Sequence, residues 1–401
     1  MAAQLLIADL FPQKYIDACA DLGLRVDYRP KLTADDLASQ IGEAAILVVR
    51  STEVRADCIA AGRNLALIVR AGAGVNTIDV RAANARGISV SNCPGKNAVA
   101  VAELTMGLLL ALDRRIAENV ADLRAGRWNK AEYSKAKGVF GRTLGVIGVG
   151  QIGREVIRRA RVFGMNVAAW SRSLTPDDAR LLGVQFAPSV RELVPSCDAV
   201  SIHLALNPET RGIVSRDLLA LMKPGAIFLN TSRAELVDEA ALIEAVQQGR
   251  IRVGTDVFAG EPEGKSGQCS LRLAQTAGVY GTHHIGASTE QAQDAVAQEV
   301  LAVLKEYVIR GSVRNWVNRA KETPASCQLV VRHFDKPGVL ANVLADLKEA
   351  NLNVQEVENV IFEGGTTACC TLRLDAVPPD EVMSRIRSRS DEVIQASLVR
   401  L

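Results

Sequence analysis

The sequence lacks the features that mark membrane proteins, zinc-binding proteins and disulfide-stabilised proteins. No stretch of its 401 residues approaches the roughly 18 uninterrupted apolar residues of a membrane-spanning helix. The eight cysteines are scattered without a C-x-x-C pair, so neither a zinc site nor a disulfide framework is predicted. The first residues, MAAQLLIADLF, have no basic flank and are interrupted by Asp9, which argues against a signal peptide. We therefore expect a cytoplasmic protein with reduced cysteines, no membrane segment and no metal.

Neither sign of charge is in excess. The chain carries 47 basic and 45 acidic residues, which gives a formal net charge of +2. A balance so close to neutral argues against nucleic acid or a membrane surface as a dedicated partner. Hydrophobic residues make up 48% of the chain, so a sizeable core can be buried, and the length suggests two or three domains.

Short apolar runs alternate with helical patterns along most of the chain, which is typical of βα units and a parallel sheet. The expected strands are 5–9, 44–49, 65–69, 143–147, 166–170, 198–204, 225–232, 253–258 and 278–284. The expected helices are 34–44, 97–126, 154–163 and 290–310. We predict an α/β fold with two Rossmann-like, doubly wound parallel-sheet domains.

The C-terminal part of the chain has a different pattern. A polar segment with one proline, residues 315–326, indicates an interdomain linker. Residues 327–401 then follow the order strand, helix, strand, strand, helix, strand, which predicts a ferredoxin-like module.

The glycine motif Gly148-Val149-Gly150-Gln151-Ile152-Gly153 fits G-x-G-x-x-G. A strand is expected before it and a helix after it, which is the context of a dinucleotide-binding turn. The helix N-terminus would offer N–H groups and a positive dipole end to the phosphates. The motif therefore predicts a site for NAD or NADP.

The strand after this motif leaves the choice of cofactor open. An Asp or Glu is expected about 20 residues further on, where it binds the ribose 2′-hydroxyl. This chain has Ser171 followed by Arg172 instead. Without the carboxylate a 2′-phosphate is not repelled, and Arg172 can pair with it, which favours NADP. The alternative is that Arg172 points to solvent or stacks on the adenine and that NAD is used.

Three successive strand ends carry the side chains that hydride transfer from a secondary alcohol requires. That reaction needs a base, a carboxylate that orients the base, and a cation that holds the substrate carboxylate. Arg233 follows one expected strand, Asp256 and Glu261 follow the next, and His284 follows a third. Because the carboxyl ends of parallel strands meet at one edge of a sheet, we expect these side chains around a single site.

The chain resembles the D-isomer-specific 2-hydroxyacid dehydrogenases over nearly its whole length. The matching motifs are VRST (49–52), RAGAGVNTID (70–79), NAVAVAELT (97–105), GVIGVGQIG (145–153), NTSRAELVDE (230–239), DVFAGEP (256–262) and HIGAST (284–289). Within the family it is most similar to the members that oxidise 3-phosphoglycerate. The resemblance implies a substrate domain formed by two segments around a dinucleotide domain, then a linker and an ACT domain, with the boundaries 1–96, 97–286, 287–316, 317–326 and 327–401.

The resemblance also implies a role for each strand-end side chain. Arg233 would bind the substrate carboxylate and carbonyl, His284 would be the acid–base group, and Glu261 would raise the pKa of that histidine. The expected cofactor contacts are Ala73, Gly148, Gly150, Gln151, Ile152, Gly153, Ser171, Arg172, His203, Leu204, Thr231, Ser232, Asp256, His284 and Gly286. The expected substrate contacts are Arg50, Ser51, Arg70, Gly72, Ala73, Gly74, Asn97 and Arg233. The chain departs from the family at His283, where a proline is usual, and at Ser171.

The activity implied is the oxidation of 3-phospho-D-glycerate to 3-phosphohydroxypyruvate at the entry to L-serine biosynthesis, with Arg50 and Arg70 as candidate partners of the phosphate. A glyoxylate or hydroxypyruvate reductase is the alternative within the family. An NAD(H)-sensing, corepressor-like interaction protein is the alternative from another class, and the intact set of Arg233, Glu261 and His284 argues against it.

The segment CQLVVRHFDKPGVLANVLADLKEANLNV (327–354) resembles an ACT domain. In regulated members of the family such domains pair between subunits and bind serine, so His333, Asp335 and Asn353 are the expected effector contacts. The alternative is an ACT domain that only mediates dimerisation, or one that has lost effector binding. Pairing of sheet edges predicts a homodimer or homotetramer.

Overall fold

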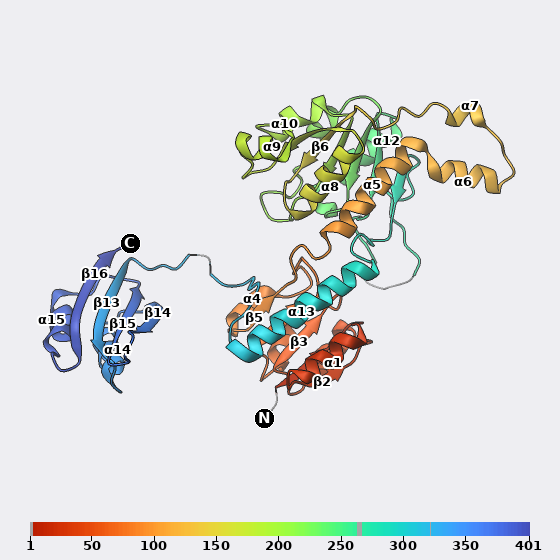
Figure 1. The fold of residues 1–401 in the computed structure, drawn as a ribbon. Helices are drawn as coiled ribbons and strands as arrows, with labels where there is room; N and C mark the ends of the chain where they lie inside the picture. Colours follow the sequence, from red (N-terminus) through yellow and green to blue (C-terminus); the bar gives the residue numbers. More distant parts are fainter. Residues whose placement is uncertain (1–2, 263–266, 321) are drawn as a thin grey trace. The chain divides into compact units, whose positions relative to one another are not determined.

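The computed structural model describes residues 3–262, 267–320 and 322–401. The chain divides into two compact units, Met1–Asn318 and Arg319–Leu401 (Figure 1). The first unit contains two parallel sheets and the second contains one antiparallel sheet. This is the α/β class with two Rossmann-like sheets that the sequence predicts.

The first sheet of the large unit has five parallel strands in the order β2-β1-β3-β4-β5. These are β1 (Gln4–Ile7), β2 (Arg25–Tyr28), β3 (Ile46–Val49), β4 (Leu67–Arg70) and β5 (Ser89–Ser91). One face packs on α2 (Ala34–Gln40), α3 (Ala56–Ala61) and α4 (Val80–Ala85). The other packs on α1 (Gln13–Asp21) and α13 (Glu290–Arg310).

Helix α13 therefore returns from the far end of the large unit to complete the domain that the N-terminal residues begin. Its Val300, Val303 and Leu304 are fully buried in the same core as Leu5 and Leu67 of the sheet. Figure 1 shows α13 alongside α1 and β3.

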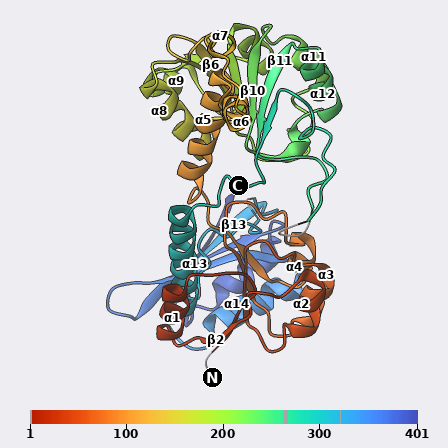
Figure 2. The same ribbon diagram turned by 90° about the vertical axis from the view of Figure 1, so that its right-hand side faces the viewer.

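The second sheet has seven parallel strands in the order β12-β11-β10-β9-β6-β7-β8. These are β6 (Thr143–Ile147), β7 (Asn166–Trp170), β8 (Gln185–Phe186), β9 (Ala199–Ile202), β10 (Ala226–Asn230), β11 (Ile251–Thr255) and β12 (Val279–Gly281). Figure 2 shows helices on both faces of this sheet, α8 (Gln151–Val162) on one side and α12 (Glu239–Gln247) on the other. All seven carboxyl ends share one edge, and the candidate residues follow those ends.

The expected single helix over 97–126 is wrong in one respect, because it breaks at Arg115. Helix α5 (Ala98–Arg114) ends there, and α6 (Ile116–Arg124) starts in a new direction. Arg115 has a left-handed backbone, with φ +51°, although no glycine or proline marks the break. Its guanidinium pairs with Glu132 and lies 5.1 Å from the ring centre of Tyr133. These contacts connect it to α7 (Lys130–Tyr133), and α6 and α7 form an arm at the end of α5 (Figure 1).

The C-terminal unit is a four-stranded antiparallel sheet in the order β14-β15-β13-β16. Its elements follow the predicted order: β13 (Cys327–Phe334), α14 (Val339–Glu349), β14 (Val354–Ile361), β15 (Thr367–Leu374), α15 (Asp380–Ser388) and β16 (Val393–Arg400). The order of strands is that of a ferredoxin-like module. Asp346 of α14, 3% exposed, accepts two hydrogen bonds from Arg389, which follows α15 (2.6 and 3.0 Å). This ion pair links the two helices of the unit.

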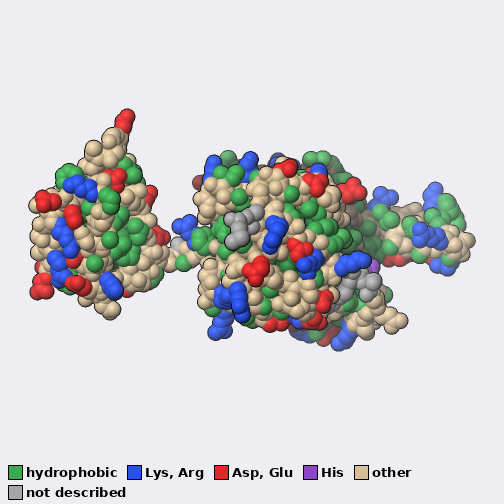
Figure 3. Space-filling view, turned by 90° about the horizontal axis from the view of Figure 1, so that it is seen from below, with side chains coloured by type: hydrophobic (Ala, Val, Ile, Leu, Met, Phe, Trp, Pro, Cys, Tyr) green, Lys and Arg blue, Asp and Glu red, His purple; other side chains and the backbone are tan. Residues whose placement is uncertain are grey.

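Acidic and basic side chains are interspersed over the surface seen in Figure 3, and neither sign forms a broad field. Among the described residues, no helix combines the length and the apolar character needed to cross a bilayer. The part of the chain that the structure describes also holds no group of three or more His, Cys, Asp or Glu side chains arranged as metal ligands.

Candidate active site

The glycine motif lies at the carboxyl end of β6, with Gly150 as the residue before α8. Gly148 has φ +101°, and a Cβ atom there would lie 2.4 Å from the backbone oxygen of His203. A Cβ atom on Gly153 would lie 2.0 Å from the oxygen of Gly148, so the first turn of α8 packs directly on the strand end. By contrast, a Cβ atom on Gly150 would meet nothing within 4 Å. The backbone is therefore open to a ligand at the helix N-terminus, which is the arrangement that fits a dinucleotide pyrophosphate.

The neighbouring strand ends supply one buried and one exposed polar group. After β9, His203 is 8% exposed and its Nε2 is bonded to Oγ of Ser201 at 2.8 Å. Burial lowers the pKa of His203 to about 3, so its imidazole stays neutral. After β7, Arg172 is exposed and pairs with Glu209 at 2.7 Å between Nη1 and Oε2.

Thr231 and Ser232 follow β10 and are buried. Oγ1 of Thr231 is bonded to Oγ1 of Thr105 on α5 (2.8 Å), and Oγ of Ser232 donates to the backbone oxygen of Ile202 (2.7 Å). These bonds fix the turn that carries Arg233.

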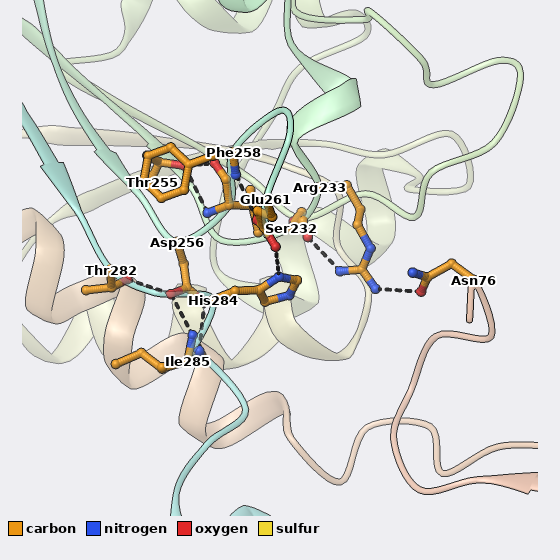
Figure 4. A network of polar contacts seen from close by, with 12 residues as sticks. Asn76, Ser232, Arg233, Thr255, Asp256, Phe258, Glu261, Thr282, His284 and Ile285 are labelled. Carbon is orange, nitrogen blue, oxygen red and sulfur yellow. Dashed lines mark hydrogen bonds and ion pairs between the residues drawn. The ribbon is translucent and has the colours of Figure 1, made fainter. Parts of the chain in front are cut away.

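Glu261 and His284 form a hydrogen-bonded pair, as Figure 4 shows. Nδ1 of His284 lies 2.6 Å from Oε2 of Glu261, while Oε1 of Glu261 accepts the N–H of Phe258 at 2.8 Å. The bond to Glu261 raises the pKa of His284 above its usual 6.5, against the opposing effect of burial. Burial pushes the pKa of Glu261 upward, but the hydrogen bonds from His284 and Phe258 outweigh it, and the net pKa is lowered. Nε2 of His284 has no bond to any described residue, so it is the nitrogen available to a substrate.

The segment around His284 is held by Asp256, which is 2% exposed. This carboxylate accepts hydrogen bonds from Oγ1 of Thr282 (2.6 Å), the N–H of Ile285 (2.8 Å) and the N–H of Gly286 (2.7 Å). His284 lies between these anchors with a left-handed backbone, φ +52°. Such a conformation is uncommon outside glycine and persists when the surroundings fix it. Asp256 therefore sets the direction of the imidazole through the backbone.

Arg233 lies beside His284 at the end of β10 and also reaches the other domain of the large unit (Figure 4). Its Nη1 donates to the backbone oxygen of Ser232 (2.7 Å), and its Nη2 donates to Oδ1 of Asn76 (3.5 Å). A Cβ atom on Gly74 would come within 2.9 Å of the same Nη2. No carboxylate pairs with Arg233 among the described residues, so its guanidinium can bind an anionic ligand.

Arg70 is the last residue of β4 and Arg50 follows β3, and both add positive charge to this region. Nε of Arg70 is buried and has no hydrogen-bond partner among the described residues. Burial, together with the charges of Arg233 and Arg50, lowers the pKa of Arg70 to about 10. The guanidinium occupies the space that a side chain at Gly72 would need, since a Cβ atom there would lie 1.4 Å from Nη1.

Side chains of other residues hold the backbone groups of Arg50, Ser51 and Ala73 in the substrate loops. The N–H groups of Arg50, Ser51 and Thr52 all donate to Oδ2 of Asp9, at 2.7, 2.9 and 3.0 Å. The backbone oxygen of Ala73 accepts a hydrogen bond from Asn92. Asn97 starts α5, and its Oδ1 is buried without a partner among the described residues.

The structure thus brings Arg233, Asp256, Glu261 and His284 together at one sheet edge. Sequence reasoning missed Asp9 and Glu209. The position of Asp9 at the end of an apolar strand could have indicated its role, because a polar side chain buried there needs hydrogen-bond partners. Glu209 lies in a polar loop and had no such indication.

The three expected effector residues lie in the C-terminal unit. His333 is 2% exposed, with Nδ1 bonded to the backbone oxygen of Phe334 (2.8 Å) and Nε2 to Oδ1 of Asn359 (3.1 Å). The N–H of Asp335 donates to Thr366, and the N–H of Asn353 donates to Asp375.

Comparisons with known proteins identify the family of the chain. Residues 106–286 match the NAD binding domain of the D-isomer specific 2-hydroxyacid dehydrogenases. The chain is 43% identical over 272 residues to the hydroxypyruvate reductase of Thermotoga maritima, a match that covers 67% of this chain and 87% of that protein. The chain belongs to the D-isomer specific 2-hydroxyacid dehydrogenase family and is an NAD-dependent oxidoreductase.

Two further relatives differ in length and in the activity that their names state. The D-3-phosphoglycerate dehydrogenase of Methanocaldococcus jannaschii is 37% identical over 357 residues, which is 88% of this chain and 67% of that enzyme. The chain thus spans about two thirds of the length of such relatives. The glyoxylate reductase of Paecilomyes thermophila has a solved structure that is 30% identical, with a TM-score of 0.69, covering 79% of this chain and 98% of that one.

Proposed function

We propose that the chain oxidises 3-phospho-D-glycerate to 3-phosphohydroxypyruvate with NAD, at the entry to L-serine biosynthesis in the cytoplasm. The observation that carries the substrate assignment is the charge around Arg233. A 2-hydroxy acid with one carboxylate needs one guanidinium, whereas Arg233 is accompanied by Arg70, which has an unbonded buried Nε, and by Arg50. A substrate with both a carboxylate and a phosphate matches this excess of positive charge.

The glycine turn at the start of α8 would hold the dinucleotide pyrophosphate, and the buried Asp256 would lie near the nicotinamide. When bound, NAD supplies the acceptor for the hydride that leaves C2 of the substrate. In the oxidation, Nε2 of His284 takes the proton of the C2 hydroxyl, and Glu261 stabilises the imidazolium that results. Arg233 holds the carboxylate so that C2 faces the cofactor.

Steady-state rates with 3-phosphoglycerate, D-glycerate and D-lactate test the substrate, each with NAD and with NADP. We expect kcat/KM for 3-phosphoglycerate to exceed the values for the other two by about a hundredfold or more, since two anionic groups are bound in place of one. Arg233→Ala should lower every one of these values, and an Arg233→Ala protein with full activity would refute the site. Equal rates with D-glycerate would refute the phosphate assignment alone.

Hydroxypyruvate reduction is the second candidate, because the relative from Thermotoga maritima carries that name at 43% identity over 87% of its length. The same arginines would then bind a smaller acid. A higher kcat/KM for hydroxypyruvate than for 3-phosphohydroxypyruvate in the reverse direction would favour it.

We further propose that the C-terminal unit is an ACT domain that pairs between subunits and binds L-serine. Its two edge strands expose apolar side chains, Val357, Val360 and Ile361 on β14 and Ile394 and Val399 on β16. Edges of this kind favour association with a second copy into a homodimer or homotetramer. We expect L-serine to inhibit the enzyme and Asp335→Ala to abolish this inhibition, which steady-state rates measure. The mass in solution should be that of a dimer or a tetramer.

A further inference from the structure

The loop after β9 supplies a carboxylate where the sequence after β7 lacks one. In dinucleotide-binding folds the acidic residue that holds the adenosine ribose follows the second strand. Here that position carries Ser171 and Arg172, a pair that taken alone favours the phosphate of NADP. In the structure, Nη1 of Arg172 lies 2.7 Å from Oε2 of Glu209. The guanidinium is therefore paired with a carboxylate 37 positions further along the chain.

The order of strands determines where this ion pair lies. β6 lies between β7 and β9, and the three strands are parallel, so their carboxyl ends share one edge. An ion pair between the residues that follow β7 and β9 must span the end of β6. The glycine turn begins at that end, immediately after Ile147. The Glu209 carboxylate, carried by the loop after β9, thus meets Arg172 after β7, where the adenosine ribose of a bound dinucleotide is expected.

The backbone that carries Glu209 is fixed by a set of local hydrogen bonds. Oδ1 of Asn207 accepts the N–H groups of Glu209 and Thr210, both at 2.9 Å. Oγ1 of Thr210 in turn donates to the backbone oxygen of Ala205 at 2.7 Å. The loop therefore holds the backbone of Glu209 in a defined place, from which its side chain reaches Arg172.

We propose that Glu209 is the residue that makes this dehydrogenase prefer NAD over NADP. Its carboxylate cancels the attraction of Arg172 for a 2′-phosphate, repels the phosphate itself, and offers an acceptor to the ribose hydroxyls. Arg172 serves to orient that carboxylate. The proposal rests on the NAD-binding domain of the family and not on the substrate assigned above.

Equilibrium binding of NADH and NADPH to the full chain tests this without turnover, by fluorescence or calorimetry. We expect the unmodified protein to bind NADH at least about tenfold more tightly than NADPH. In Glu209→Gln the affinity for NADPH should rise about tenfold, while that for NADH changes by less than about threefold. Adenosine 2′,5′-bisphosphate and 5′-AMP should show the same loss of discrimination, because the change concerns the adenosine half only.

Two further variants make the result decisive. Asp177→Asn breaks an ion pair of similar exposure on α9 (Pro176–Leu182), where Asp177 and Arg180 are 80% and 79% exposed against 73% and 81% for Glu209 and Arg172. It should leave the NADH-to-NADPH ratio unchanged. Adding Arg172→Gln to Glu209→Gln should abolish the gain in NADPH affinity. The proposal is overturned if Glu209→Gln moves the ratio no more than Asp177→Asn, if the gain survives in the double variant, or if the unmodified protein prefers NADPH.

Discussion

His284 follows β12 and His333 lies within β13, and the two regions that contain them use a histidine in different ways. The side chain of His284 is 49% exposed and leaves Nε2 free of any described residue, whereas His333 is 2% exposed and both of its ring nitrogens are bonded within the C-terminal unit. The difference follows from the sheets. In the parallel sheet all carboxyl ends meet at one edge, where side chains leave the core. In the antiparallel sheet, alternate residues of β13 face the helices, and His333 has the same parity as Cys327, Leu329 and Val331.

The largest effect expected from this comparison is on turnover. His284→Gln should lower kcat by about 10²- to 10⁴-fold, since it removes the group that exchanges the hydroxyl proton. His283→Gln, at the exposed neighbour, should leave kcat within about twofold, as surface substitutions away from the reacting groups usually do. Steady-state kinetics of both variants measure this, and a similar loss in both would remove the distinction between the two histidines.

The next effect is on stability and concerns the other region. Asp346→Ala should lower the stability of the C-terminal unit by about 3–5 kcal/mol, because it leaves a partly buried Arg389 without its carboxylate. Hydrogen exchange of residues 327–401 compared with 143–255 would locate the loss. Glu244→Ala, which breaks the exposed pair with Arg216, should leave the stability nearly unchanged. If Asp346→Ala instead reduced protection in the large unit, the separation of the two regions would be refuted.

A smaller effect, on KM, distinguishes binding of the substrate phosphate from binding of the substrate carboxylate. Arg70→Met should raise KM for 3-phosphoglycerate by about ten- to a hundredfold, since one charge-assisted contact is lost. KM for D-glycerate should change much less. The ratio of the two values is the measurement, and an equal rise for both substrates would assign Arg70 to the carboxylate or to the fold.

The smallest effect is a displacement of the pH profile. Oxidation requires neutral His284, so its rate rises as the pH passes upward through the raised pKa of that group. Glu261→Gln removes the carboxylate that retains the proton, and the rising limb should move to lower pH. Glu239→Gln provides the control, because Glu239 bonds the N–H of Ala259 in the same loop and should leave the limb in place. An unmoved limb in Glu261→Gln would count against the pair.

The sequence was sufficient for features that depend on local pattern. The glycine motif and the apolar run before it predict the strand, turn and helix around Gly148. The approach of Glu261 to His284 is predicted because both residues follow parallel strands, whose carboxyl ends meet at one edge of the sheet. The break at Arg115 could not be predicted in this way, because no glycine or proline marks it and the contacts of Arg115 with α7 join residues far apart in the sequence. The pairing of Arg172 with Glu209 was equally out of reach, since it depends on the order of three strands and on a turn fixed by Asn207. Contacts between residues far apart in the sequence cannot be predicted from local secondary-structure propensity.

The left-handed backbone at His284 has a consequence for which amino acids the chain tolerates there. Side chains branched at Cβ are strongly disfavoured in that conformation, whereas glycine, asparagine and aspartate adopt it readily. A library randomised at this codon and selected only for soluble, folded protein should therefore be depleted in valine, isoleucine and threonine, before any selection for catalysis is applied.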